Sequence, residues 1–206
     1  MTTATRTVPM RADQAAECGA VLARAFADDP LFNWILQNET RRDASLRWFM
    51  PTAARYGDRH GHVFTTDTTP EGAAVWLPPG DVKVTMLRMV QGGLLRAPLK
   101  FGVGGFRRFL KAMDTFEHLH DRDMPMPHWY LMLLGVDPPR QGQGVGGTLL
   151  QPMLARADAE GMPCYLETQK AINVPFYQRH GFETVVELDM PDGGPHCWTM
   201  KRTPRS

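Results

Sequence analysis

The sequence predicts one α/β domain, because strand-like and helix-like segments alternate along the whole chain of 206 residues. Short runs rich in β-branched and aromatic residues are typical of strands, whereas apolar residues three or four positions apart are typical of helices. Turns rich in glycine or proline separate the two kinds of segment. With 43% hydrophobic and 22% charged residues, the composition is that of a globular protein with a sizeable core.

The first part of the chain is expected to form a strand, three helices and a β-hairpin. Asp13 is a suitable N-cap for the first helix. This helix should end near Asp28-Asp29-Pro30, because proline disfavours helix in the residue before it. The expected ranges of the other elements are 5–10 for the opening strand, 32–36 and 43–55 for the second and third helices, and 62–66 and 72–77 for the hairpin.

Residues 81–127 interrupt the strands and are expected to form a mainly helical insertion. One helix should run from Val84 to Leu95 and another from Phe106 to about His118. The glycines at 102, 104 and 105 are expected to form a hinge-like connection between them. The apolar stripe of the second helix is far more typical of core packing than of a binding surface.

The second half of the chain is expected to alternate between strands and helices and to close with a hairpin. Gly161 and Gly181 should end its two helices, and Asp192-Gly193-Gly194 should form the hairpin turn. The expected ranges are a strand from 129, a helix over 146–160, a strand at 163–168, a short helix over 174–179, and strands at 183–190 and 196–201.

Composition and charge exclude several classes of protein. A formal net charge of +1 offers no general field for nucleic acid or a membrane surface. Cys18, Cys164 and Cys197 are too far apart to suggest a disulfide framework or a zinc site. No run approaches the ~20 apolar residues of a membrane span, and the N-terminus lacks the apolar core of a signal peptide. We therefore expect a cytoplasmic protein with no metal, nucleic-acid or membrane partner.

A glycine-rich segment lies between the strand that starts at Trp129 and the helix that follows. The chain turns through Asp137-Pro138-Pro139, passes the glycines of Gln141 to Gly147 and enters a helical pattern. At a helix N-terminus, free backbone N–H groups and the helix dipole favour negative charge. Glycine lets a phosphate lie against bare backbone and permits positive φ. The segment therefore predicts a site for a phosphorylated ligand.

Three interpretations of this segment can be compared on sequence alone. Gly142-x-Gly144-x-x-Gly147 matches a dinucleotide fingerprint, with Glu167 at the position of the ribose-binding acid. However, residues 137–141 separate the strand from the first glycine, and too little chain remains for further βαβ units. A P-loop is excluded because no Gly-Lys-Ser/Thr follows. The third interpretation is a purely structural turn, which the number of glycines makes weaker than a phosphate site.

Two blocks of the sequence resemble motifs of the GNAT superfamily of N-acetyltransferases. The expected order of strands and helices is also similar to that of the superfamily. Gln141-Gly142-Gln143-Gly144-Val145-Gly146 is similar to its acyl-CoA signature, Q/R-x-x-G-x-G/A. The block from Asn173 to Phe182 resembles its later motif, which ends in Y-x-x-x-G-F. Three further segments, at residues 25–30, 74–76 and 197–200, resemble puromycin N-acetyltransferase and its relatives.

The resemblance implies a GNAT fold, in which flanking helices cover a central mixed, mostly antiparallel sheet with splayed central strands. It also implies acetyl-CoA as the donor, with the pantetheine arm along the strand and the pyrophosphate at the helix N-terminus. Asn173 would contact the arm, although capping a helix is an equally physical role for it. The residues expected to bind the donor are Leu134, Gly135, Val136, Gln141, Gly142, Gln143, Gly144, Val145, Gly146, Gly147, Asn173 and Phe176.

The resemblance assigns Tyr177 as the acid that protonates the departing CoA thiolate. Glu167 and His118 are the candidates for the general base. Glu167 could instead make a structural hydrogen bond, and His118 could instead be a plain surface residue. His118-x-His120 lacks a third ligand for a metal. We expect acetyl transfer to a primary amine of a small molecule, by direct attack in a ternary complex, in a monomer or homodimer. The rival functions are a non-catalytic acyl-CoA-binding module and an acetyltransferase for protein N-termini or lysines.

Overall fold

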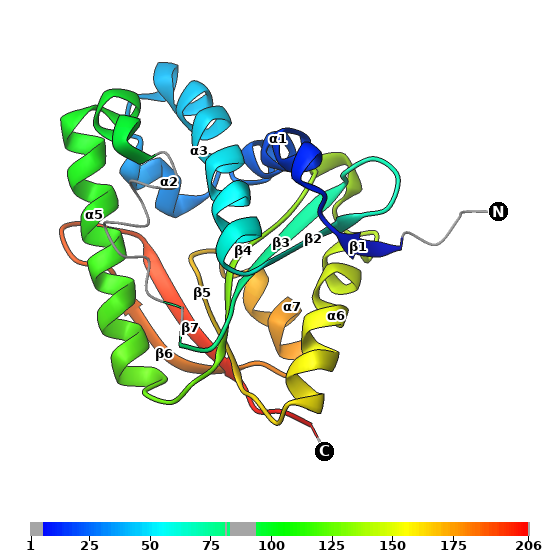
Figure 1. The fold of residues 1–206 in the computed structure, drawn as a ribbon. Helices are drawn as coiled ribbons and strands as arrows, with labels where there is room; N and C mark the ends of the chain where they lie inside the picture. Colours follow the sequence, from blue (N-terminus) through cyan, green and yellow to red (C-terminus); the bar gives the residue numbers. More distant parts are fainter. Residues whose placement is uncertain (1–5, 81, 83–93, 206) are drawn as a thin grey trace.

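A seven-stranded sheet in the order β1-β2-β3-β4-β5-β7-β6 forms the centre of the molecule (Figure 1). The structure is a computed structural model, and it describes residues 6–80, 82 and 94–205. The strands are β1 (Thr7–Pro9), β2 (His62–Thr66), β3 (Gly72–Leu77), β4 (Trp129–Val136), β5 (Cys164–Thr168), β6 (Glu183–Asp189) and β7 (His196–Arg202). The helices are α1 (Ala15–Ala25), α2 (Pro30–Ile35), α3 (Glu39–His60), α5 (Ala97–Asp123), α6 (Val145–Ala159) and α7 (Asn173–Arg179), with short 3-10 turns η1 (Ala12–Gln14), η2 (Leu94–Arg96) and η3 (Pro138–Arg140).

The two central strands of the sheet separate after a short contact. All neighbouring strands are antiparallel except β4 and β5, which pair in parallel through only Trp129 with Cys164 and Tyr130 with Tyr165. Beyond these pairs β4 stays bonded to β3, and β5 stays bonded to β7. The remainder of β4 thus presents an unpaired edge toward β5. This confirms the splayed central strands and the mostly antiparallel sheet.

Helices cover both faces of the sheet, as Figure 1 shows. Successive strand residues point to opposite faces. On β3, Ala73 and Val75 therefore pack with the cluster that includes α1, α2, α3 and α5, whereas Ala74 and Trp76 pack with the cluster that includes α6 and α7. All four side chains are fully buried. A strand buried on both faces reads as a continuous apolar run, as expected for Gly72 to Leu77.

Three N-terminal helix boundaries differ from those expected. Asp13 lies inside η1 and binds Arg11 instead of capping α1, so the prediction of an Asp13 cap is wrong. Helix α1 ends at Ala25, and the buried Asp29 caps α2 by accepting the backbone N–H of Leu31. Helix α3 begins earlier and ends later than expected, because Asn38 supplies an N-cap that the apolar spacing did not reveal.

The described residues of the insertion hold one long helix, α5, which extends to Asp123. Gly102 has a φ of 72° and a ψ of 164°, so the hinge expected among the three glycines lies at this residue, whereas the other two are helical. The expected helix from Val84 lies outside the described residues except for Leu94 and Leu95, which begin η2.

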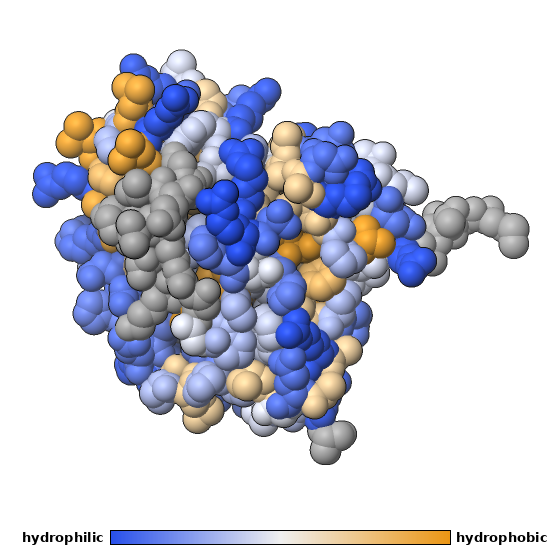
Figure 2. All heavy atoms as spheres, viewed as in Figure 1, coloured by the Kyte–Doolittle hydropathy of each residue, from blue (hydrophilic) through white to orange (hydrophobic). Residues whose placement is uncertain are grey.

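Apolar side chains gather on the surface over the start of α5 (Figure 2), where Leu95, Leu99 and Val103 are exposed. Among the described parts of the chain, no helix combines the length and the apolar character needed to cross a bilayer.

An ion pair joins the buried Arg202 of the last strand to the partly exposed Asp158 of α6. The guanidinium of Arg202, only 3% exposed, donates two hydrogen bonds of 2.7 Å to Asp158, whose pKa it holds below the usual range. We expect Asp158→Asn to lower the free energy of unfolding by about 3 kcal/mol, because it leaves a buried cation unpaired. Urea denaturation at pH 7 measures this loss. Because the pKa of Asp158 is lowered by folding, the stabilisation should be present at neutral pH and disappear as the pH falls below about 4.

The exposed pair between Arg11 and Asp13 is the matched control, because both side chains are more than half exposed. Asp13→Asn should change the free energy of unfolding by less than about 0.5 kcal/mol. An equal loss in the two variants would contradict the special role of the pair between Arg202 and Asp158.

Candidate active site

The start of α6 presents bare backbone to solvent. Gly142 and Gly144 have φ values of 73° and 84°, and a Cβ added at either would meet nothing within 4 Å. Gly144 is the N-cap of α6, and the first backbone N–H groups of a helix have no partner inside it. The side chains of Gln141 and Gln143 fold back to donate to the carbonyls of Val136 and Pro139. The two glutamines hold the loop, and its backbone is left to meet an anion.

Other glycines of the expected donor site allow close packing. A Cβ at Gly146 would lie 3.3 Å from the ring of Phe176, and one at Gly147 would lie 3.0 Å from His180. A Cβ at Gly135 would lie 2.8 Å from Leu22 and 2.9 Å from Ala25. These glycines bring α7 against α6 and α1 against β4, so they shape the site by letting its walls approach.

A cavity of about 380 Å³ opens where β4 and β5 separate. Of the residues expected in the site, Leu134, Glu167, Asn173 and Tyr177 line it. Helices α2, α3 and α5 supply the opposite wall. The lining from these helices and their flanking loops includes Phe26, Asp29, Phe32, Phe49, Thr52, Tyr56, Phe109, Met113, Phe116, Glu117 and His120.

Tyr177 reaches the cavity from α7 and is 7% exposed. Burial raises the pKa of its phenol above the ordinary value, and the charge of Asp29 raises it further. The hydroxyl is therefore protonated at neutral pH and can donate a proton or a hydrogen bond. Asn173 is the first residue of α7, and its side chain donates to Thr168 Oγ1 at 3.1 Å. The capping role considered for Asn173 is thus wrong, because its amide ties α7 to the end of β5.

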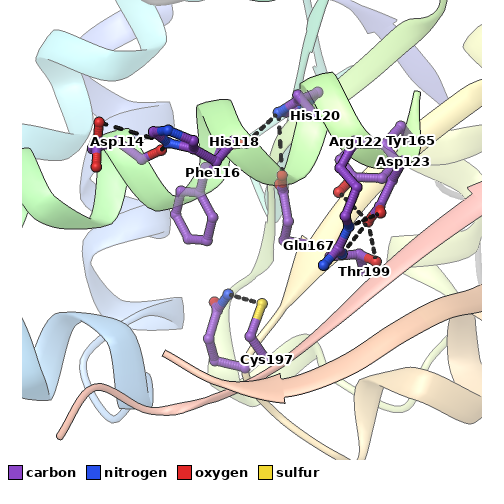
Figure 3. A network of polar contacts seen from close by, with 11 residues as sticks. Asp114, Phe116, His118, His120, Arg122, Asp123, Tyr165, Glu167, Cys197 and Thr199 are labelled. Carbon is purple, nitrogen blue, oxygen red and sulfur yellow. Dashed lines mark hydrogen bonds and ion pairs between the residues drawn. The ribbon is translucent and has the colours of Figure 1, made fainter. Parts of the chain in front are cut away.

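Glu167 is buried at the inner end of the cavity. Its side chain is 3% exposed, and its Oε1 lies 3.3 Å from His120 Nδ1 (Figure 3). Burial raises the pKa of Glu167 to about 8, although a hydrogen bond from Tyr130 opposes the rise. Burial also lowers the pKa of His120 to about 4, and its Nδ1 faces the carbonyl of Phe116 at 3.0 Å. Within the described residues, Glu167 Oε1 and His120 Nε2 have no hydrogen-bond partner.

The end of α5, which carries His120, is anchored to the sheet by Asp123. This carboxylate accepts hydrogen bonds from Thr199 on β7 at 2.7 Å and from Tyr165 on β5 at 3.2 Å, and it pairs with Arg122 (Figure 3). Burial raises the pKa of Asp123, but the hydrogen bonds from Arg122 and Thr199 outweigh it, so the pKa lies below the ordinary value. The network fixes the last turn of the helix opposite Glu167.

The structure does not bring His118 to the cavity. Its side chain is 77% exposed and faces Asp114, whose carbonyl lies 2.7 Å from Nδ1 and raises the pKa of the imidazole. Residues two positions apart on a helix point to nearly opposite sides, so His120 lies inside when His118 lies outside. Of the two histidines in this turn of α5, His120 and not His118 contacts Glu167.

Asp29 lies in the segment from Phe26 to Trp34, which the sequence predicts to line the acceptor side, and the structure places it in the cavity lining. It is 6% exposed, and one carboxylate oxygen accepts the backbone N–H groups of Leu31 and Phe32. Burial raises its pKa to about 6. The available signal was Asp followed by Pro30, an N-cap before a proline at the first helical position. In the described part of the chain, no group of three or more His, Cys, Asp or Glu could hold a metal ion.

A family model and a curated protein are similar to this chain in sequence. The model of the Acetyltransferase (GNAT) family matches residues 105–182, which include β4, the glycine-rich turn and α7. A Schizosaccharomyces pombe protein described as an uncharacterized N-acetyltransferase is 28% identical over 176 residues, which span 81% of this chain and 69% of that protein.

Solved structures share the fold over almost the full length. A Corynebacterium glutamicum protein, described as histone acetyltransferase HPA2 and related acetyltransferase, has a TM-score of 0.70 and 23% identity, covering 99% of this chain and 98% of its own. The Drosophila melanogaster polyamine N-acetyltransferase has a TM-score of 0.66 and 16% identity, covering 96% and 98%. Arylalkylamine N-acetyltransferase 2 of Aedes aegypti has a TM-score of 0.63 and 13% identity, covering 98% and 100%. At these identities the likeness concerns the fold.

Proposed function

We propose that this chain transfers an acetyl group from acetyl-CoA to a primary amine of a small molecule. The premise is that the matched family and the shared fold support an acyl-CoA-dependent N-acetyltransferase of the GNAT superfamily. The observation that carries the proposal is the opening between β4 and β5. It joins a glycine-lined helix start to a cavity that holds a protonated tyrosine and a buried carboxylate.

The donor half of the site fits coenzyme A by its chemistry. The backbone N–H groups at the start of α6 offer donors and a positive dipole end to a pyrophosphate. The unpaired edge of β4, including Leu134 and Val136, offers backbone groups to the amides of a pantetheine arm. Asn173, beside Tyr177 in the cavity lining, adds a side-chain amide.

The acceptor half supplies a base and an acid. In the proposed reaction, the ionised Glu167 carboxylate removes a proton from the attacking ammonium, directly or through a water. The amine nitrogen then forms the new C–N bond as the C–S bond of the thioester breaks. Tyr177 donates its phenolic proton to the leaving thiolate, and the nitrogen of the new amide gives up its second proton, which restores the phenol. His118 lies outside the cavity, so this mechanism gives it no step, and Asp29 is the rival base because it is the second buried carboxylate there.

A small-molecule acceptor is favoured over a protein because helices α2, α3 and α5 line the side of the cavity opposite the sheet. Asp192, in the turn before β7, contacts Trp34 through its carbonyl and pairs with Lys111, which draws the hairpin over α2 and α5. The names of the Drosophila and Aedes relatives also designate small amines as acceptors. The finer resemblance to puromycin N-acetyltransferase is part of this proposal, supported by Phe26 and Asp29 in the cavity lining. The proposal treats the chain as a single cytoplasmic domain that acts as a monomer or homodimer.

Thiol release from acetyl-CoA over a panel of primary amines tests the proposal. We expect acetyl-CoA to raise the melting temperature and at least one small amine to yield free CoA. Stabilisation by acetyl-CoA without turnover of any amine would favour the non-catalytic module. Turnover of peptides alone would favour the protein acetyltransferase. Absence of any thermal shift with CoA would overturn the donor assignment.

Gly144→Ala tests the donor half separately. At a φ of 84° an alanine is strained by about 1–2 kcal/mol, and its methyl group would occupy the open space in front of α6. We expect the Kd for CoA to rise about tenfold, equivalent to ~1.4 kcal/mol, as measured by calorimetry. Gly193→Ala is the matched control, because Gly193 also has a positive φ and open space but lies in the β6–β7 turn. A similar rise in Kd for the control would contradict the assignment.

A further inference from the structure

Four phenylalanines form a continuous aromatic wall in the cavity. Phe26 meets Phe32 at 5.7 Å between ring centroids, Phe32 meets Phe49 at 5.7 Å, and Phe49 meets Phe109 at 5.7 Å. They come from four different segments: the end of α1, then α2, α3 and α5. All four line the cavity. We call this set the phenylalanine wall. Its edge-to-face and tilted geometries are those that aromatic rings prefer, so a further ring can add to the stack.

The charged groups around the cavity are acidic. Among its described lining residues there is no lysine or arginine, whereas Asp29 and Glu167 are both buried carboxylates in the lining. Glu167 Oε1 is buried without a hydrogen-bond partner among the described residues. A buried carboxylate oxygen without a partner is costly, and a cationic ligand removes the cost. A ligand that carries its own carboxylate would meet like charge instead.

We propose that the acceptor is an aralkylamine, meaning a primary amine joined by a short carbon chain to an aromatic ring, with no carboxylate beside the amine. This rests on the proposed acetyltransferase function and specifies its substrate class. The ring packs against the phenylalanine wall, and the ammonium lies among Asp29 and Glu167. Polyamines carry the ammonium but have no ring to pack against the phenylalanine wall. Aromatic amino acids have the ring, but they bring a carboxylate close to Asp29 and Glu167.

Matched amines test this specificity. With saturating acetyl-CoA, kcat/KM is measured for 2-phenylethylamine, propylamine, phenylalanine, putrescine and a short peptide with a free N-terminus. We expect 2-phenylethylamine to exceed propylamine, which lacks the ring, by about 10- to 100-fold. It should exceed phenylalanine, which adds only the carboxylate, by about 100-fold or more. Preference for putrescine or for the peptide would overturn the inference, as would equal rates for 2-phenylethylamine and propylamine.

Two leucine variants test the wall itself. Phe49→Leu should lower the ratio of kcat/KM for 2-phenylethylamine to that for propylamine about fivefold. Phe101 is the matched control, because it packs against Phe49 and Phe109 at 5.7 and 5.6 Å but does not line the cavity. Phe101→Leu should leave the ratio unchanged. Since the ratio compares two substrates on one preparation, partial unfolding cancels. An unchanged ratio in Phe49→Leu, or an equal fall in both, would overturn the role of the wall.

The outcomes separate this inference from the function on which it rests. If no amine in the panel yields free CoA, the proposed acetyltransferase activity is itself overturned. If putrescine or the peptide is turned over in preference to 2-phenylethylamine, the activity stands and only the aralkylamine class is wrong.

Discussion

Tyr177→Phe is expected to lower kcat about 100-fold or more, because general acid catalysis by a positioned side chain contributes roughly 10²- to 10⁴-fold. The phenol is buried, and its raised pKa keeps the proton available for the leaving thiolate. The ring itself stays in place through its edge-to-face contacts with Phe176 and Phe182. Binding of acetyl-CoA should therefore change little. Single-turnover thiol release, together with the Kd for CoA, measures the two effects.

Tyr165→Phe is the matched control for this prediction. Tyr165 is also buried, but its hydroxyl donates to Asp123 and it does not line the cavity. This variant should lose about 1 kcal/mol of stability and keep most of its kcat. If Tyr177→Phe retained nearly full kcat, the acid role would be wrong and Tyr177 would be a packing residue.

Glu167→Gln is expected to lower kcat/KM about 100- to 1,000-fold, because an amide cannot accept the proton of the ammonium. The same substitution at the rival base, Asp29→Asn, should leave a larger part of the activity. Both variants keep the side-chain size and one acceptor oxygen, and circular dichroism checks that they fold. If Asp29→Asn were the more damaging variant, the base would be Asp29.

The pH profile separates the two carboxylates without mutation. In the free enzyme, kcat/KM should rise with pH up to about 8 if Glu167 is the base, but only up to about 6 if it is Asp29. An acceptor amine with a pKa above about 9 stays an ammonium throughout this range, so its own titration adds no break to the profile there. The break in the profile, rather than its slope, therefore identifies the base. Three titratable groups surround Glu167. In this pH range His120 and Tyr130 are neutral, and Asp123 is ionised.

The same raised pKa predicts a change in stability. Folding raises the pKa of Glu167 from its ordinary value to about 8, so the protonated carboxyl is favoured in the folded state. This stabilisation is complete below about pH 4 and disappears as the pH rises through about 8. Without ligand, the melting temperature of the wild type should fall between pH 5 and 8 more than that of Glu167→Gln. Equal falls would mean that Glu167 is already ionised at neutral pH.

Local patterns were sufficient to predict most elements, including the glycine-rich turn before α6. The hairpin of β2 and β3 has the expected bounds because two short strand-like runs and the polar turn between them determine it locally. The glycine-rich turn and the start of α6 follow from contiguous residues. The splay of β4 and β5 is a relation between distant strands, and it was predicted only through the resemblance to a superfamily.

The acceptor half depends on which side of a helix meets the sheet, which local pattern does not determine. His118 and His120 are indistinguishable as residue types, and the rotation of α5 decides between them. That rotation is set by contacts of Asp123 with Thr199 and Tyr165, far along the chain. The segment from Phe26 to Trp34 was expected on the acceptor side, but a chemical role for the Asp29 carboxylate was not predicted, because its burial in the cavity depends on α7 and β4.

The unpaired edge of β4 means that the two halves of the proposed site depend on the sequence in different ways. In the proposed enzyme the donor meets main-chain groups, which every residue type provides equally, so side chains at Leu134 and Val136 can change without loss of recognition. An alanine scan of β4 would overlook these main-chain contacts, whereas replacing a backbone amide by an ester would reveal them. The acceptor half consists of side chains from α2, α3 and α5, and each substitution there alters selectivity. New acceptors are thus accessible by mutation while the use of the donor is inherited unchanged.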